Sequence, residues 1–456
     1  MKYRLFALLV ICFFKGYSQQ TPIFNLLRYD DDFSYLKNDT SKSWYSKLKY
    51  QPLSSDGNAY ISFGGDFRYQ YFYLRNERWG EFATVDWFLY ARHIVHADLH
   101  LNQKLRMFVQ LQSSIAPGKN NKSPVDQNTL DLQQAFIEYH SSGDVSQKLL
   151  LRFGRQELNY GSQRLVSVSE GPNNRQIFDA FKFQYAAKNL VTDLFYSHHL
   201  QDRKGVFDDR YDKNNRFFGS YTVLSDIPVF QNVDLYYFGL NKKRAVFDEA
   251  VGKENRHTIG TRVSGKTSSW RYDVEGDFQF GRFAGKRISA WQFSSNAGYK
   301  LNQLKFQPEI GLKTDVISGD EHAGDNLHRS FNPLFNRGGY FGLAALVSPV
   351  NLIDIHPSLK FELIKKKLAT QIGYTAFWRY SKNDGFYGPG VSLLYSGNNT
   401  TNKFIGDQVV WQMTFSPNAF LYISPEFTWF RAGAYLKEVG PGKNLVYTGL
   451  TTQLKF

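Results

Sequence analysis

The segment from Leu151 to Phe183 concentrates arginine and carboxylate side chains. A planar guanidinium group can hold a carboxylate through two parallel hydrogen bonds. Several such groups along a narrow path could therefore bind an acidic solute weakly at successive positions, as conduction requires. The alternative is structural, because the same arginines could pair with neighbouring acids and pin a loop. Both interpretations stay open for Arg152, Arg155, Arg164 and Arg175 beside Glu157, Glu170 and Asp179.

The elements that must position these residues have a period of two. From Trp270 to Phe280, aromatic, Val and Gly residues alternate with Arg271, Asp273, Glu275, Asp277 and Gln279. Such runs exceed the five or six residues usual for a soluble strand. The pattern recurs at 61–73, 87–101, 105–112, 306–316, 353–363, 368–380 and the terminal 446–456.

A transmembrane β-barrel explains this alternation better than a soluble sandwich. Charges on the second face of a sandwich would cost several kcal/mol each if buried and unpaired, whereas a barrel turns that face to a watered lumen. A helical membrane protein is excluded, because a spanning helix needs about 20 apolar residues and the longest apolar run is Leu5 to Phe14. The general lining predicted for the lumen is Arg68, Arg92, Arg106, Lys182, Arg262, Lys313 and Arg379.

The fold class predicted is therefore all-β, an antiparallel transmembrane barrel. We count about eighteen or nineteen periodic segments, the uncertain one being 340–348, and commit to eighteen because closure favours an even number. Short turns such as 101–104 alternate with long polar connections, which indicates short periplasmic turns and long external loops. The long connections are 116–129, 202–216, 317–338 and 382–403.

The N-terminus has the pattern of a secretory signal peptide, with Lys2 and Arg4 before the apolar run and cleavage expected after Ser18. The predicted organisation is a signal peptide at 1–18, a periplasmic segment at 19–58 and the barrel at 59–456. Cleavage lowers the formal net charge from +14 to +11, because it removes three basic residues and no acid. An exported basic protein of this kind favours an anionic solute or lipid headgroups over nucleic acid.

Two segments carry a more specific signal. Within 151–183 stand GRQEL, GSQRL and NNRQIFDA, and FNPLFNRGGYFG occupies 331–342. Together they resemble the alginate-export family of outer-membrane porins. The resemblance implies a large barrel, usually of eighteen strands, whose basic lumen passes an anionic polysaccharide or its fragments. It places the first segment at the constriction, where the matching residues are Arg155, Gln156, Glu157, Gly161, Gln163, Arg164, Asn173, Arg175 and Asp179.

No resident cofactor or zinc site is predicted. His93 points away from His96 on a strand, and His96 and His100 stand roughly 13 Å apart at about 3.3 Å per residue, too far to share a zinc ion. The acidic stretches 202–212 and 319–326 could ligate calcium, although such runs are more often solvated loops.

Two rival classes are a barrel enzyme and a surface glycan-binding protein. The sequence has no G-x-S-x-G motif, and Ser197, His198 and Asp193 would share one strand with His198 on the opposite face, which cannot form a catalytic triad. A glycan-binding protein would explain the aromatic residues but not the ionic faces. A monomer is the expected oligomeric state.

Overall fold

The computed structural model describes residues 24–40, 43–82, 84–141, 147–322, 324–397 and 400–456. The predicted signal peptide lies outside these residues. Within them, neither α1 (Trp44–Lys49) nor α2 (Ala434–Val439) is long or apolar enough to cross a bilayer as a helix.

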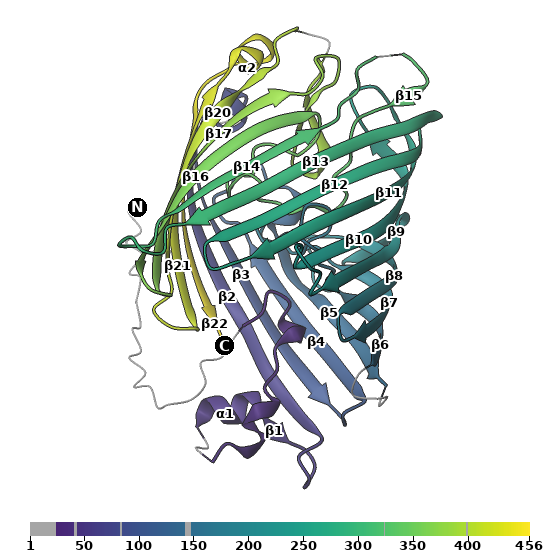
Figure 1. Ribbon diagram of the computed structural model, residues 1–456, viewed down its shortest axis with the longest axis vertical. Coiled ribbons are helices and arrows are strands. Elements are labelled where there is room, and N and C mark those ends of the chain that lie inside the picture. The colour runs from purple at the N-terminus through teal and green to yellow at the C-terminus, as the bar shows by residue number, and fades with distance from the viewer. Residues whose placement is uncertain (1–23, 41–42, 83, 142–146, 323, 398–399) are drawn as a thin grey trace.

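The chain forms a closed antiparallel barrel of 18 strands (Figure 1). Neighbours in sequence pair in space around the barrel, and β2 closes it by pairing with both β3 and β22. The first nine strands are β2 (Tyr60–Arg75), β3 (Val85–His100), β4 (Leu105–Ile115), β5 (Asn128–His140), β6 (Lys148–Gln156), β7 (Phe178–Ala187), β8 (Leu190–Gln201), β9 (Arg210–Ser225) and β10 (Asn232–Val246). The others are β11 (Val251–Lys266), β12 (Trp270–Phe283), β13 (Lys286–Lys300), β14 (Glu309–Ile317), β16 (Leu352–Ile364), β17 (Leu368–Arg379), β20 (Phe404–Phe415), β21 (Leu421–Ala432) and β22 (Leu445–Lys455).

The two faces of the strands divide as the period of two predicts. On β12, Trp270 is 55% exposed on the outside, while Glu275 and Asp277 are buried inside. On β6, Phe153 is 70% exposed and Arg152 is buried. The described part of the chain therefore places no second protein layer over these apolar side chains, which are available to lipid.

The long connections all lie at one end of the barrel, which also carries the short turns β10–β11 and β12–β13. The turns β3–β4, β7–β8, β11–β12 and β16–β17 are short, and the connections β6–β7, β14–β16, β17–β20 and β21–β22 are long. The long end carries α2, at the top of Figure 1. Which end faces the cell exterior stays a prediction.

Three boundaries differ from those predicted. Strand β9 begins at Arg210, so the predicted loop 202–216 is shorter than expected. Phe306 lies in a turn at φ 65°, and β14 begins only at Glu309. Residues 340–348 form no strand but part of the long β14–β16 connection, which supports the count of eighteen.

The interior near the long end is more apolar than the predicted ionic face. Phe195, Phe217 and Phe238 point inward there and pack with Leu165 and Phe335 of two inward-folded connections. Those connections, 157–177 and 318–351, occupy the barrel, so the wall beside them is a packed core. Toward the long end of β12, Arg282 lies on the exposed outer face and Phe283 is buried inside.

The N-terminal segment also enters the barrel. It contains η1 (Arg28–Asp30), η2 (Ser34–Asn38), α1 and the short β1 (Gln51–Pro52), which pairs with the start of β2. In Figure 1, α1 and β1 lie at the lower end of β2. Arg28 is buried and donates to the carbonyl oxygens of Gly65 and Phe456, which fixes the segment to the inner side of the closing strands.

Candidate functional site

Glu170 is the centre of the charge network inside the barrel. Its carboxylate lies 2.5 Å from Arg92 Nη2, 2.8 Å from Arg175 Nε and 3.4 Å from Arg68 Nη1. Arg68 also donates to the carbonyl oxygens of Glu170 and Pro172. Burial alone would raise the pKa of Glu170, but these arginines hold it below its ordinary value. The connection 157–177 is thus fastened to β2 and β3.

A second group of arginines fastens the N-terminal segment. Arg106 contacts Asp98 at 2.7 Å and donates to the carbonyl oxygen of Tyr29. Arg152 donates to Glu138 at 2.6 Å and stacks on Tyr29 at 4.0 Å from the ring centroid. Each guanidinium therefore has a carboxylate and a Tyr29 contact.

Arg155 and Arg164, the strongest candidates in the sequence, are also paired. Arg155 lies 3.0 Å from Asp179 and 3.5 Å from Asp131. Arg164 reaches across to β12, where its Nη1 lies 2.6 Å from Asp273 and 2.7 Å from Glu275.

These contacts therefore agree with the structural interpretation, in which the arginines pair with acids and hold a loop in place. Arg155 pairs with Asp179, as that alternative named, and Arg175 contacts Glu157 at 3.2 Å as well as Glu170. Sequence alone did not indicate that Arg164 pairs with acids more than 100 residues away. Three basic residues predicted as general lining of the lumen are also paired with acids: Arg262 with Asp234 and Asp273, Lys182 with Asp193, and Lys313 with Asp315. Arg379 donates to main-chain carbonyl oxygens.

Basic residues are in excess at the mouth of the barrel on the side of the short turns, which we call the short-turn mouth. A cavity of about 350 Å³ on the inner side of β10 to β13 has three basic residues, Arg262, Lys266 and Arg271, against the single acid Asp273. Gln231, Asn232, Asn296 and Tyr272 complete its polar lining. Arg271 is held by Glu309 at 2.5 Å and Asn296 at 2.7 Å.

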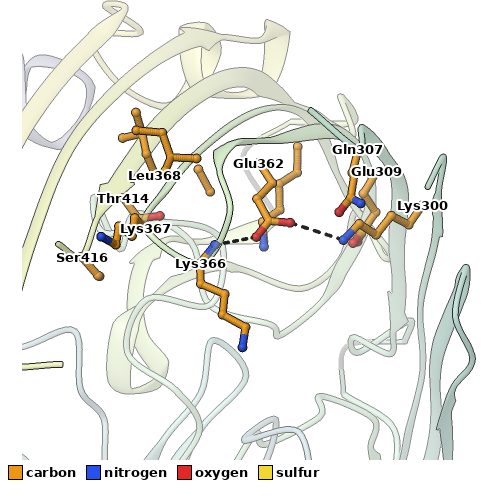
Figure 2. A pocket seen from close by; sticks show the side chains of 12 residues that line it. Lys300, Gln307, Glu309, Glu362, Lys366, Lys367, Leu368, Thr414 and Ser416 are labelled. Atoms are coloured by element: carbon orange, nitrogen blue, oxygen red, sulfur yellow. Dashed lines mark hydrogen bonds and ion pairs between the residues drawn. The ribbon is translucent and has the colours of Figure 1, made fainter. Parts of the chain in front are cut away.

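A neighbouring cavity of about 300 Å³ continues this basic wall toward β20 (Figure 2). Four lysines line it beside two glutamates: Lys300, Lys360, Lys366, Lys367, Glu309 and Glu362. Figure 2 shows Glu362 between Lys300 and the main-chain N–H of Lys366. We call these two cavities the basic vestibule. The lysines of the vestibule are not among the residues predicted from the sequence, although Arg271 stands on the polar face of 270–280.

The opposite wall of the same mouth is acidic. A cavity of about 310 Å³ there is lined by Asp30, Asp31 and Asp32 of the N-terminal segment together with Arg106, His100 and His140. The mouth is thus divided between a basic wall and an acidic one. This division could not be predicted from the sequence, because residues 19–58 have no clear period.

Both acidic stretches suggested for calcium contribute to clusters of possible metal ligands. Asp208 and Asp209 lie with Asp131, and Asp320 lies with Glu249 and His328, with the ligand atoms of each cluster within 4.8 Å of one another. In the first loop, burial and then the charge of Asp209 raise the pKa of Asp202 to about 7. Burial also raises the pKa of Asp209 to about 6.

We expect Asp202→Asn to stabilise the protein by about 1 to 3 kcal/mol at pH 8 and to leave stability unchanged at pH 4. A carboxyl whose pKa is raised on folding contributes stability that is complete below its unfolded pKa and is lost as the pH rises through the folded value. Asparagine carries no such cost. Thermal unfolding in detergent at both pH values measures the effect. Asp226→Asn, in an exposed turn, is the control, and an equal gain at pH 4 would contradict the assignment.

A family model described as alginate export matches residues 59–444. The chain belongs to the alginate export family. The solved structures that resemble it are outer-membrane porins of Pseudomonas aeruginosa. OccK3 (OpdO) has 10% identity and a TM-score of 0.56 over 86% of this chain and 95% of its own. OccK2 (OpdF) in complex with glucuronate has 11% identity and a TM-score of 0.57, over 87% of this chain and 98% of its own. OccD3 (OpdP) has 12% identity and a TM-score of 0.57, over 90% of this chain and 93% of its own. No curated protein sequence matches the chain.

Membership of the alginate export family makes the chain an outer-membrane channel and not an enzyme. The low identity to the solved porins means that this likeness concerns the fold alone.

Proposed function

We propose that this channel passes anionic saccharides of the uronate class by passive diffusion, and that the basic vestibule attracts their carboxylates. The observation that carries the proposal is the cavity lined by Arg262, Lys266 and Arg271. The lining of this cavity has three basic residues and one acid, although Arg262 also pairs with Asp234 and Asp273, and Arg271 with Glu309.

The size and chemistry of this cavity suit a sugar acid. Its volume of about 350 Å³ lies within the range of small-molecule sites. Guanidinium forks recognise carboxylates, and the amides of Asn232 and Asn296 can bind hydroxyl groups. Because Arg271 is already held by Glu309 and Asn296, a solute would compete for it and bind weakly, which favours passage.

The names of the relatives support the same solute class. Alginate is a polymer of uronates, and two of the similar porin structures contain glucuronate and vanillate, both of which are carboxylates.

We propose that the arginines of the constriction contribute to the electrostatic field along the path of the solute. The residues concerned are Arg68, Arg92, Arg106, Arg152, Arg155, Arg164 and Arg175, with Glu157 and Asp179 as their counter-charges. Neutralising Arg155 and Arg164 together lowers anion selectivity under this proposal. Unchanged selectivity would assign both residues to the scaffold.

The basic vestibule is tested by Arg262→Gln combined with Arg271→Gln. We expect the chloride-to-potassium permeability ratio in a planar bilayer to fall about threefold or more, because two charges facing the path are removed. Block of the current by glucuronate should weaken in parallel. Both effects should decrease at high salt.

Arg282→Gln is the matched control for this experiment, since Arg282 lies on the same strand as Arg271 but on its exposed outer face. An unchanged permeability ratio in the double variant would overturn the vestibule proposal. Absence of any conductance from the wild-type protein would favour a surface glycan-binding role instead.

We further propose that the channel works as a monomer surrounded by lipid. Exposed apolar side chains occur on strands around the barrel, including Tyr71, Ile137, Leu235, Ile310 and Ile372. Native mass spectrometry from detergent would test the oligomeric state.

A further inference from the structure

Two connections at the long-loop end bring a histidine and two carboxylates together. Glu249 lies in the β10–β11 turn, Asp320 follows β14, and His328 belongs to the short strand β15 (Leu327–His328), which pairs with β13. Their ligand atoms lie within 4.8 Å of one another, and His328 Nδ1 is 3.4 Å from Glu249 Oε2. The long-loop end is distinct from the basic vestibule.

Two of the three side chains are buried, and Asp320 has a polar atom left over. His328 is fully buried between Phe247 and Phe283, and its Nδ1 faces Glu249 Oε2. Asp320 is 2% exposed; its Oδ1 accepts from His322 N and Arg329, while Oδ2 has no hydrogen-bond partner in the described chain. A buried polar atom without a partner costs free energy.

We propose that Glu249, Asp320 and His328 bind a divalent transition-metal ion of the zinc class, with water completing the coordination. Zinc binds His nitrogen and carboxylate oxygen at about 2.0 to 2.2 Å in a tetrahedral arrangement, which places two ligand atoms about 3.3 Å apart. The His328–Glu249 separation of 3.4 Å already fits this spacing. Calcium prefers oxygen ligands only, so the imidazole favours zinc.

The site has a structural consequence for the channel. His328 lies shortly before Phe331 and Phe335 in the sequence, and both phenylalanines are buried in the barrel interior. Asp320 N and the Ser330 hydroxyl both donate to Asp384 of the β17–β20 connection. A metal ion here would fasten the inward connection 318–351 to the β10–β11 turn.

Lys286 supplies a competing charge. Its ammonium group contacts Glu249 Oε1, and its side chain is 22% exposed, so it can move toward solvent. A bound metal ion would replace this cation beside Glu249. Removing the lysine charge should therefore favour metal binding, because a like charge at this distance is repulsive.

The experiment uses refolded, lipopolysaccharide-free protein in detergent, stripped with EDTA and titrated with zinc against a chelating dye. We expect one equivalent of zinc to bind. His328→Gln and Asp320→Asn should each weaken binding at least tenfold, and Lys286→Gln should strengthen it severalfold. His322→Gln, an exposed histidine of the same connection, should leave it unchanged.

The tighter binding expected for Lys286→Gln cannot arise from a failure to fold. The proposal would be overturned by substoichiometric zinc in the wild-type protein or by equal zinc affinity in the His328 and Asp320 variants. Calcium displacing zinc at equal concentration would also overturn it, since that result indicates an oxygen-only site such as Asp131, Asp208 and Asp209.

Discussion

Glu170→Gln should destabilise the protein by about 3 to 5 kcal/mol, because it leaves three buried arginines short of a counter-charge. Arg92 would retain only Asp66 at 3.6 Å, and Arg175 would retain Glu157. The glutamine cannot neutralise either guanidinium, and neither can reach bulk water. Urea unfolding in lipid vesicles measures the loss. Because the connection 157–177 depends on this carboxylate, we also expect larger current fluctuations through the open channel.

Glu362→Gln is the control for this prediction. Glu362 also pairs with a basic residue, Lys300 at 3.4 Å, but the Lys300 side chain is 32% exposed, whereas the Arg92 and Arg175 side chains beside Glu170 are buried. An exposed pair of this kind contributes less than about 1 kcal/mol. If the two variants lost the same free energy of unfolding, the central role assigned to Glu170 would be wrong.

Deleting residues 24–32 should raise single-channel conductance by a factor of about two and shift selectivity toward anions. The segment occupies one side of the short-turn mouth, where Tyr29 donates to the carbonyl oxygen of Glu157 and Arg175 donates to that of Leu26. Its removal widens the mouth. It also removes the exposed Asp30 and Asp32, opposite the basic vestibule, and the buried pair of Arg28 and Asp31, so that two negative charges are lost in total. Planar bilayer recordings report both quantities.

A second variant separates the two effects. Asp30→Asn with Asp32→Asn removes two exposed charges but keeps the segment in place. We expect this variant to shift selectivity while conductance changes little. Unchanged conductance after the deletion would show that solute does not pass along this wall.

The fold could be predicted because alternation is a local property. Each strand exposes one face to hydrocarbon and turns the other inward, so residues such as Trp270 and Glu275 reveal their environment from spacing alone. The family resemblance also depended on contiguous segments. Both predictions were confirmed, together with the count of eighteen strands. The aromatic interior near Phe195 and Phe217 was not anticipated, since its partners are inward connections whose course has no sequence period.

The sequence by itself determined a barrel, its family and the residue types that could meet an acidic solute. Only the tertiary structure decided which of those residues are already paired. Arg164 meets Asp273 and Glu275 across the lumen, and Arg175 meets Glu170 within a folded connection. The physical reason is that strand alternation is set by near neighbours along the chain, whereas the partners of a charge are set by how distant segments fold together. Closure of the barrel likewise brings Arg262, Lys266 and Arg271 to one wall of the mouth and Asp30 to the other.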